Sequence, residues 1–206
     1  YWGTSEWDPA DIREAMAICE RFGLMKPVVE QPQYNLLNRQ RFECEYSRLF
    51  EKTGYGTTIW SPLAGGLLTD KYLSGKATEG RYSTDLLNFK KRFEDLVAGG
   101  DSTDYLNKLR KFDELAKSEG VTCAQLSMAW CLYNKDVSVA LTGASKPEQL
   151  LDSLKAVELL KRYTPELDRK IEDIFQNLPS GAVIHSTQQL TPSRRLVFSP
   201  LLANKS

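Results

Sequence analysis

The sequence has little of several features that mark specialised classes of protein. Its 206 residues include one histidine, His185, and four cysteines without any CxxC spacing, so no zinc site is expected. Lysine plus arginine equals aspartate plus glutamate, at 27 each, which leaves no positive field to attract nucleic acid or an anionic membrane. No apolar run reaches the roughly 18 residues of a membrane-spanning helix. We therefore expect no nucleic-acid partner, no metal and no membrane insertion.

The composition is that of an ordinary globular protein, with 41% hydrophobic and 26% charged residues. Scattered single cysteines usually pack as small apolar side chains in a reducing compartment. The first residues also lack the basic and then apolar layout of a signal peptide. These features predict a cytoplasmic protein. The sequence starts at Tyr1 rather than Met, inside an expected strand, and we expect it to be a fragment or an incomplete gene model.

Hydrophobic patterning predicts strands that alternate with helices. Short apolar, β-prone runs predict strands at residues 1–4, 24–34, 57–60 and 137–142. Helical periodicity, together with capping residues, predicts helices at residues 8–22, 39–52, 102–119, 122–134, 147–160 and 165–178. Residues 64–101 are expected to form a long, mostly irregular loop, and such loops usually carry function. This alternation predicts an α/β fold with a parallel sheet that is covered by helices.

Two parallel architectures compete for this pattern. A doubly wound dinucleotide fold needs GxGxxG directly after a strand, and the nearest approach, at residues 54–56, precedes its strand and lacks the third glycine. We therefore favour a (β/α)₈ TIM barrel, which binds ligands at the carboxyl ends of its strands. Four βα units make half of such a barrel, so we expect a half-barrel domain over residues 1–180. Residues 181–206, which include His185 and no acidic residue, are expected to be a disordered tail.

Each expected strand ends in a polar signature. The four signatures are YWGTSEW at residues 1–7, EQPQYN at 30–35, WSPLAGGL at 60–67 and GASKPEQL at 143–150. In this order they resemble strands five to eight of the aldo/keto reductases. The first and third are most similar to the voltage-gated potassium channel β-subunits and their plant and microbial relatives. The resemblance implies an aldo/keto reductase barrel of which this chain holds about the last four βα units.

The resemblance also implies that NADP binds in an extended pose at the mouth of the barrel. Ser5 and Gln31 offer rigidly placed groups that can hydrogen-bond the carboxamide of the nicotinamide. Trp60 can stack on the nicotinamide ring, as the matching aromatic does in the family, with core packing as the alternative. Ser61, Leu63 and Gly65 form a small-residue turn whose backbone amides can approach the pyrophosphate.

The phosphates and the adenosine are expected to meet basic and helix-terminal residues. Lys71 and Arg81 match basic positions of the family that contact these groups, with solvated loop charges as the alternative. Ser145 with Lys146 precedes a helix whose first amides form an anion site. This pair can bind a 2′-phosphate, which favours NADP over NAD. Simple N-capping by Ser145 is the alternative reading, and both can hold together.

Three residues of the following helix complete the expected site. Gln149, Asp152 and Ser153 lie three to four residues apart on one helix face and resemble the adenine-facing positions of the channel subunits. The sequence departs from the animal channel subunits at Glu6, where they carry arginine, and at Asp152-Ser153, where they carry Glu-Asn. The full set of expected cofactor-binding residues is Ser5, Glu6, Gln31, Trp60, Ser61, Pro62, Leu63, Ala64, Gly65, Lys71, Arg81, Gly143, Ser145, Gln149, Asp152 and Ser153.

The catalytic acid of the family has no counterpart in this sequence. That acid is a tyrosine on the early strands, supported by lysine and aspartate, with a histidine or asparagine nearby. Tyr72 is not expected to replace it, because it adjoins Lys71 and adjacent side chains point apart. Glu30 alternates with Gln31 along its strand and should face the opposite side, in a structural role. We therefore expect no catalytic residue in this chain.

Three functions fit the resemblance. The first is an NADP(H)-dependent reductase of small aldehydes or ketones whose catalytic acid lies outside this chain. The second is a regulatory β-subunit, a tetramer in its family, that reports the redox state of NADP(H) to a potassium channel α-subunit. The third is an inactive truncated product. The sequence favours the first and does not identify the carbonyl substrate.

Overall fold

The computed structural model describes residues 1–84, 86–98 and 102–180. Within these residues the chain forms two compact units. The first comprises Tyr1–Pro62, Cys131–Gly143 and residues 177–180, and the second comprises Leu63–Trp130 and Ala144–Gln176. The tail expected at residues 181–206, with His185, lies outside the described residues.

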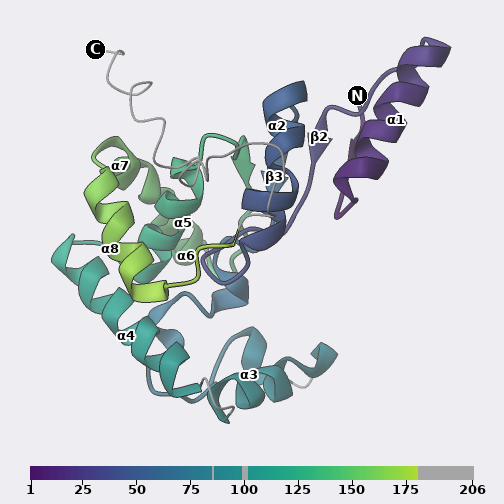
Figure 1. Ribbon diagram of the computed structural model, residues 1–206. Coiled ribbons are helices and arrows are strands. Elements are labelled where there is room, and N and C mark those ends of the chain that lie inside the picture. The colour runs from purple at the N-terminus through teal and green to yellow at the C-terminus, as the bar shows by residue number, and fades with distance from the viewer. Residues whose placement is uncertain (85, 99–101, 181–206) are drawn as a thin grey trace. The chain divides into compact units, whose positions relative to one another are not determined.

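A parallel four-stranded sheet organises the first unit (Figure 1). Its strands β1 (Gly3–Thr4), β2 (Val29–Glu30), β3 (Gly56–Ile59) and β4 (Val139–Ala140) each pair with their neighbour in the sequence. A doubly wound sheet reverses its strand order at a switch point, and this sheet keeps one order throughout. The chain is therefore an α/β protein with a parallel sheet, as the sequence predicts.

Strand β2 is much shorter than the run at residues 24–34 that predicted it. Pro27 and Pro32 flank it, and proline has no amide hydrogen to donate to a ladder. Pairing nevertheless resumes beyond Pro32, where Gln33 forms an isolated parallel bridge with Trp60. The carboxyl ends of β1, β2 and β3 consequently lie side by side.

The first unit contains one helix that matches its prediction and one that does not. Helix α1 (Pro9–Phe22) begins where Asp8 accepts a hydrogen bond from the Ala10 amide, and it ends at Gly23 in the left-handed conformation. The helix predicted at residues 39–52 is instead a π-helix, η1 (Arg41–Glu45), followed by α2 (Ser47–Thr53). The Tyr46 amide donates to the Arg41 carbonyl five residues earlier, at 3.0 Å. Periodicity predicted a helix here but does not distinguish a π-helical turn from a turn of α-helix.

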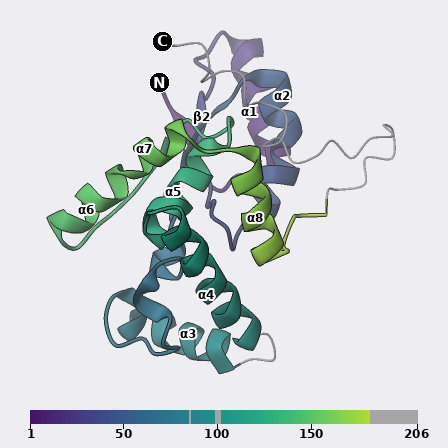
Figure 2. The same cartoon turned by 90° about the vertical axis from the view of Figure 1, so that its left-hand side faces the viewer.

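Helices make up most of the second unit (Figure 2). Helix α4 (Ser102–Ser118) packs against α3 (Phe89–Ala98) and α8 (Pro165–Phe175). Helix α5 (Cys123–Tyr133) begins with the predicted capping box, in which the amides of Thr122 and Gln125 each donate to the other residue's side chain. The predicted helices at residues 102–119, 122–134 and 165–178 are therefore confirmed.

Two predictions for this unit are wrong in detail. The described residues of the segment 64–101 are not mostly irregular. Helix α3 occupies ten of them, and four single 3₁₀ turns occur at Ala64–Gly66, Asp70–Tyr72, Arg81–Ser83 and Leu86–Asn88. Helix α3 was not predicted because its many charged residues obscure the periodicity of its apolar stripe, which includes the buried Phe93. The helix predicted at residues 147–160 breaks at Lys155 into α6 (Pro147–Leu154) and α7 (Ala156–Lys161).

Candidate cofactor site

Ser5 and Gln31 come together at the carboxyl ends of β1 and β2. The Ser5 hydroxyl donates to the Gln31 carbonyl oxygen at 2.9 Å, and the Gln31 amide donates to the Thr4 carbonyl oxygen at 2.9 Å. Both side chains are exposed. A hydroxyl that donates one hydrogen bond still accepts others, and the Gln31 side chain offers both a donor and an acceptor. This pair therefore presents the groups that a carboxamide needs.

Glu6 and Trp60 meet beside that pair. Glu6 has a left-handed backbone, with φ of 59°. Its Oε1 accepts hydrogen bonds from Trp60 Nε1 at 2.9 Å and from the Gln33 amide at 2.6 Å. Trp60 follows β3 and keeps part of its surface exposed. The structure thus gathers four of the expected residues, Ser5, Glu6, Gln31 and Trp60, at the ends of three adjacent strands.

Glu30 lies beneath these strand ends and has no exposed surface. Its carboxylate accepts hydrogen bonds from the Thr4 hydroxyl, from the Trp7 amide at 3.3 Å and from the Tyr46 hydroxyl at 3.4 Å. Burial, followed by the charge of Glu30, raises the pKa of Tyr46 well above its usual value, so Tyr46 remains a donor. Glu30 and the exposed Gln31 face opposite sides, which confirms that prediction.

The turn after β3 contains consecutive backbone amides without a partner among the described residues. Ser61, Ala64 and Gly65 have φ angles of 53°, 50° and 68°. The carbonyl oxygens of Leu63 and Ala64 accept hydrogen bonds from amides farther along the turn. Among the described residues, none accepts a hydrogen bond from the amides of Leu63, Ala64 or Gly65. Unsatisfied amides in such a conformation form a concavity that suits an anion such as a pyrophosphate.

Two tyrosines support this turn within the second unit. The Tyr82 hydroxyl donates to the Ala64 carbonyl oxygen at 3.3 Å, and the Tyr105 hydroxyl donates to the Leu67 carbonyl oxygen at 2.9 Å. Burial raises the pKa of both hydroxyls, which keeps them protonated as donors. A side chain at Gly65 would place its Cβ 3.2 Å from the Tyr82 ring. No local pattern in the sequence marks either tyrosine as a support, so neither contact was predicted.

Lys71 and Arg81 belong to the second unit as well. Lys71 is half-buried in its 3₁₀ turn, whereas Arg81 is exposed and holds its guanidinium 5.5 Å from the centre of the Phe89 ring. In the described part of the chain neither residue forms a salt bridge. Tyr72, between them, is buried, and its hydroxyl points to the Glu79 carbonyl oxygen at 3.4 Å.

The loop before α6 differs from its prediction. Lys146, and not Ser145, is the N-cap residue of α6. The Ser145 amide and hydroxyl each donate to Gln149 Oε1 at 3.1 Å, and the Lys146 amide donates to the same oxygen at 3.3 Å. The reading of Ser145 as the N-cap is therefore wrong, because Gln149 reaches back one turn and supplies the acceptor. Gly143, in the first unit, is exposed.

Asp152 and Ser153 both have partners within the protein. Asp152 accepts hydrogen bonds from the Thr122 hydroxyl at 3.1 Å and from Gln125 Nε2 at 2.6 Å, so it ties α6 to the start of α5. Ser153 is buried and donates to the Gln149 carbonyl oxygen at 2.9 Å. The capping residues of α5 were recognised in the sequence, but their long-range partner was not.

Other features of the described residues lie apart from this set. A cavity of about 530 Å³ lies between Gly75–Ala77 and α3 and is lined by none of the expected cofactor residues. No group of His, Cys, Asp or Glu side chains that could hold a metal ion occurs in the part of the chain that the structure describes. Over the same residues, every helix is too short or too polar to cross a membrane.

These features define an α/β protein whose polar groups gather where parallel strands end, the usual place for ligands in such sheets. Comparison with known proteins gives the family. The model of the aldo/keto reductase family matches residues 1–173, and the chain belongs to this family. The resemblance noted from the four strand-end signatures is thus confirmed.

The chain is also similar to curated relatives from a yeast and two plants. It is 40% identical over 179 residues to a putative voltage-gated potassium channel subunit beta of Schizosaccharomyces pombe, covering 87% of this chain and 51% of that protein. Probable voltage-gated potassium channel subunits beta of Oryza sativa and Arabidopsis thaliana are 39% and 38% identical over 180 residues, with 87% of this chain and 53% of each relative covered. The chain spans about half the length of these relatives.

Proposed function

We propose that this chain binds NADP(H) and belongs to an aldo/keto reductase that reduces aldehyde or ketone carbonyls. Residues 1–180 supply four βα units of its (β/α)₈ barrel. The observation that carries the proposal is the gathering of Ser5, Gln31 and Trp60 at the carboxyl ends of three adjacent parallel strands. In a barrel these ends form the face at which substrates and cofactors bind.

Each residue has a role that its chemistry supports. Ser5 and Gln31 hydrogen-bond the nicotinamide carboxamide, and Trp60 stacks on the ring and fixes which face meets the substrate. The free amides of Leu63, Ala64 and Gly65, in the turn that follows Ser61-Pro62, receive the pyrophosphate. The cofactor supplies a hydride when it is bound. The proton that completes the reduction comes from a group outside this chain.

The adenosine end of NADP(H) meets a second set of residues in this proposal. Lys146, at the start of α6, provides the positive charge for the 2′-phosphate, with Ser145 and the first amides of α6 beside it. Lys71 and Arg81 are free of acidic partners among the described residues and contact the other phosphates and the adenosine. Gln149, Asp152 and Ser153 shape the adenine end, chiefly by holding α6 and its preceding loop.

Cofactor preference tests this proposal. We expect calorimetry to show that NADPH binds more tightly than NADH, because only NADPH carries the 2′-phosphate. Lys146→Ala should weaken NADPH binding about tenfold, the effect of losing one charge-assisted contact, and leave NADH binding unchanged. Lys111→Ala removes an exposed lysine of α4 as a matched control and should change neither affinity. Equal affinity of the unaltered chain for both cofactors would count against NADP as the cofactor.

A second function is favoured by the names of the relatives, all three of which are described as voltage-gated potassium channel subunits beta. In this alternative the intact protein is a cytoplasmic tetramer that binds a potassium channel α-subunit and reports the redox state of NADP(H). Co-purification of the intact protein with a channel α-subunit would support it. Carbonyl reduction by the intact protein without any such association would favour the enzyme.

A further inference from the structure

We infer that Glu6 is a positioning residue that locks the Trp60 indole in place, and that Arg41 in turn holds Glu6. Glu6 acts through Trp60 rather than by touching the cofactor. The use of this lock to orient a nicotinamide ring rests on the proposed function, whereas the lock itself rests on contacts within the first unit alone.

The Glu6 carboxylate has little capacity left for a ligand. Its Oε1 accepts from Trp60 Nε1 at 2.9 Å and from the Gln33 amide at 2.6 Å. Its Oε2 pairs with Arg41 Nη1 at 3.3 Å, and the same nitrogen donates to the Glu6 carbonyl oxygen at 2.8 Å. A carboxylate accepts and does not donate, and its charge would repel a phosphate. A direct contact with the acidic parts of the cofactor is therefore unfavourable.

The geometry instead suits control of the indole ring. An indole offers one polar atom, its Nε1–H, so a hydrogen bond there fixes the rotation of the ring about its own side chain. The backbone of Trp60 is fixed as well, because its amide donates to the Pro32 carbonyl oxygen at 3.0 Å. With both ends held, the ring has one orientation before any ligand arrives, which lowers the entropic cost of stacking.

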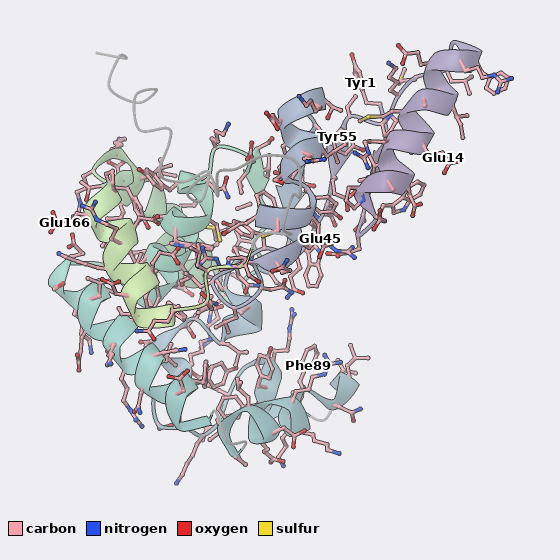
Figure 3. All side chains as sticks on the ribbon, in the orientation of Figure 1. Tyr1, Glu14, Glu45, Tyr55, Phe89 and Glu166 are labelled. Carbon is pink, nitrogen blue, oxygen red and sulfur yellow. The ribbon has the colours of Figure 1, made fainter. Side chains whose placement is uncertain are left out.

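Contacts within the π-helix place Arg41 where its guanidinium can bind the Glu6 carboxylate. It is the first residue of the π-helix Arg41–Glu45, and its Nε lies 3.4 Å from the Glu45 carboxylate (Figure 3 labels Glu45). The side chains of Arg41 and Glu6 are 34% and 39% exposed, and pairs so exposed add little to stability. π-Helical turns also occur often at functional sites. Orientation of the Glu6 carboxylate, rather than stability, is therefore the role that fits this pair.

The first arm of the test observes Trp60 in the free chain. With ¹⁵N-labelled tryptophan, the four indole groups give four Nε1–H signals, and loss of one in Trp60→Phe assigns Trp60. We expect Glu6→Ala to shift this signal and to speed its exchange with water, and Glu6→Gln, which keeps an acceptor oxygen, to restore it largely. Glu14→Ala, an exposed residue of α1 (Figure 3), is the matched control and should leave the signal unchanged. An unshifted, equally protected signal in Glu6→Ala would overturn the inference.

The second arm measures the affinity for NADPH in a double-mutant cycle. Glu6→Ala should weaken binding about tenfold in the unaltered chain, the effect of losing a charge-assisted hydrogen bond. In the Trp60→Phe background, which has a ring without an N–H, the same change should have almost no further effect. An equal loss in both backgrounds would contradict action through Trp60. The unaltered chain could bind no NADPH while Glu6→Ala still shifts the Trp60 Nε1–H signal. That outcome would contradict the proposed function but would still support the positioning of Trp60 by Glu6.

Discussion

At the scale of single residues, Glu30 is an acidic side chain that the first unit buries completely. A buried charge is tolerated only when hydrogen bonds replace its water, and Thr4, Trp7 and Tyr46 all donate to it. These donors come from β1, from the loop after it and from the end of the π-helix. Glu30 therefore holds together the segments that carry Ser5, Glu6 and Arg41.

Removing this carboxylate should be costly. Glu30→Ala removes the acceptor of the Thr4 hydroxyl and of the Trp7 amide, whereas the Tyr46 hydroxyl keeps the Trp7 carbonyl oxygen as its acceptor at 2.6 Å. We expect a loss of about 3 kcal/mol in the free energy of unfolding, measured by urea denaturation. Tyr46→Phe is a milder control, expected to lose about 1 kcal/mol, because it removes a single hydroxyl. A loss from Glu30→Ala no larger than that from Tyr46→Phe would show that Glu30 is not the centre of this network.

Cys123, in the second unit, predicts a dependence of stability on alkaline pH. Burial, followed by the nearby Asp113 carboxylate, raises the pKa of its thiol to about 12. In the unfolded chain the thiol ionises near its ordinary value of about 8.5. The contribution of Cys123 to stability should be constant below that value and should fall as the pH rises toward 12, because the thiol of the unfolded chain then binds fewer protons than that of the folded chain. Cys123→Ala should reduce the slope of unfolding free energy against pH between about 9 and 11, and an unchanged slope would contradict this.

At the scale of elements, the turn at Ala64–Gly66 depends on glycine for two separate reasons. Gly65 has a left-handed φ of 68°, and a Cβ there would lie 3.2 Å from the Tyr82 ring. Gly120 has nearly the same φ, 69°, with no atom within 4 Å of the corresponding position. Comparing alanine substitutions at these two glycines therefore separates the effect of backbone strain from that of steric contact with Tyr82.

We expect Gly120→Ala to lower the free energy of unfolding by about 1 kcal/mol through strain alone. Gly65→Ala should cost more and should also weaken NADPH binding several-fold, because the Tyr82 ring must move and release the Ala64 carbonyl oxygen. Thermal unfolding and NADPH titration of both variants check this. Equal effects of the two substitutions on both measurements would mean that contact with Tyr82 does not matter.

The elements also show what the sequence can predict. Alternation of apolar strands and periodic helices was enough for the parallel α/β sheet, for α1 with its Asp8 cap, and for the capping box of α5. The same reasoning missed α3, whose charged residues hide its apolar stripe, and the π-turn at Arg41–Glu45. The four strand-end signatures were recognised because each is contiguous in the sequence. Their partners were not, because Arg41 and Tyr82 lie 35 and 18 residues from the groups they contact.

At the scale of the whole molecule, the balanced charge of the chain requires that an anionic cofactor be held by local groups. The residues proposed for the nicotinamide belong to the first unit, and those proposed for the adenosine end belong mainly to the second. Membership of the aldo/keto reductase family over residues 1–173 spans both.

The most direct test of this account is titration of the chain with NADPH while its tryptophan fluorescence is followed. We expect saturable quenching that is lost in Trp60→Ala and kept in Trp2→Phe, which alters a tryptophan outside the proposed site. That result would support binding of the nicotinamide against Trp60 and would direct attention to the group that supplies the proton. A folded chain whose fluorescence does not respond to NADPH, or responds equally in Trp60→Ala, would contradict the assignment of these strand ends as the cofactor site.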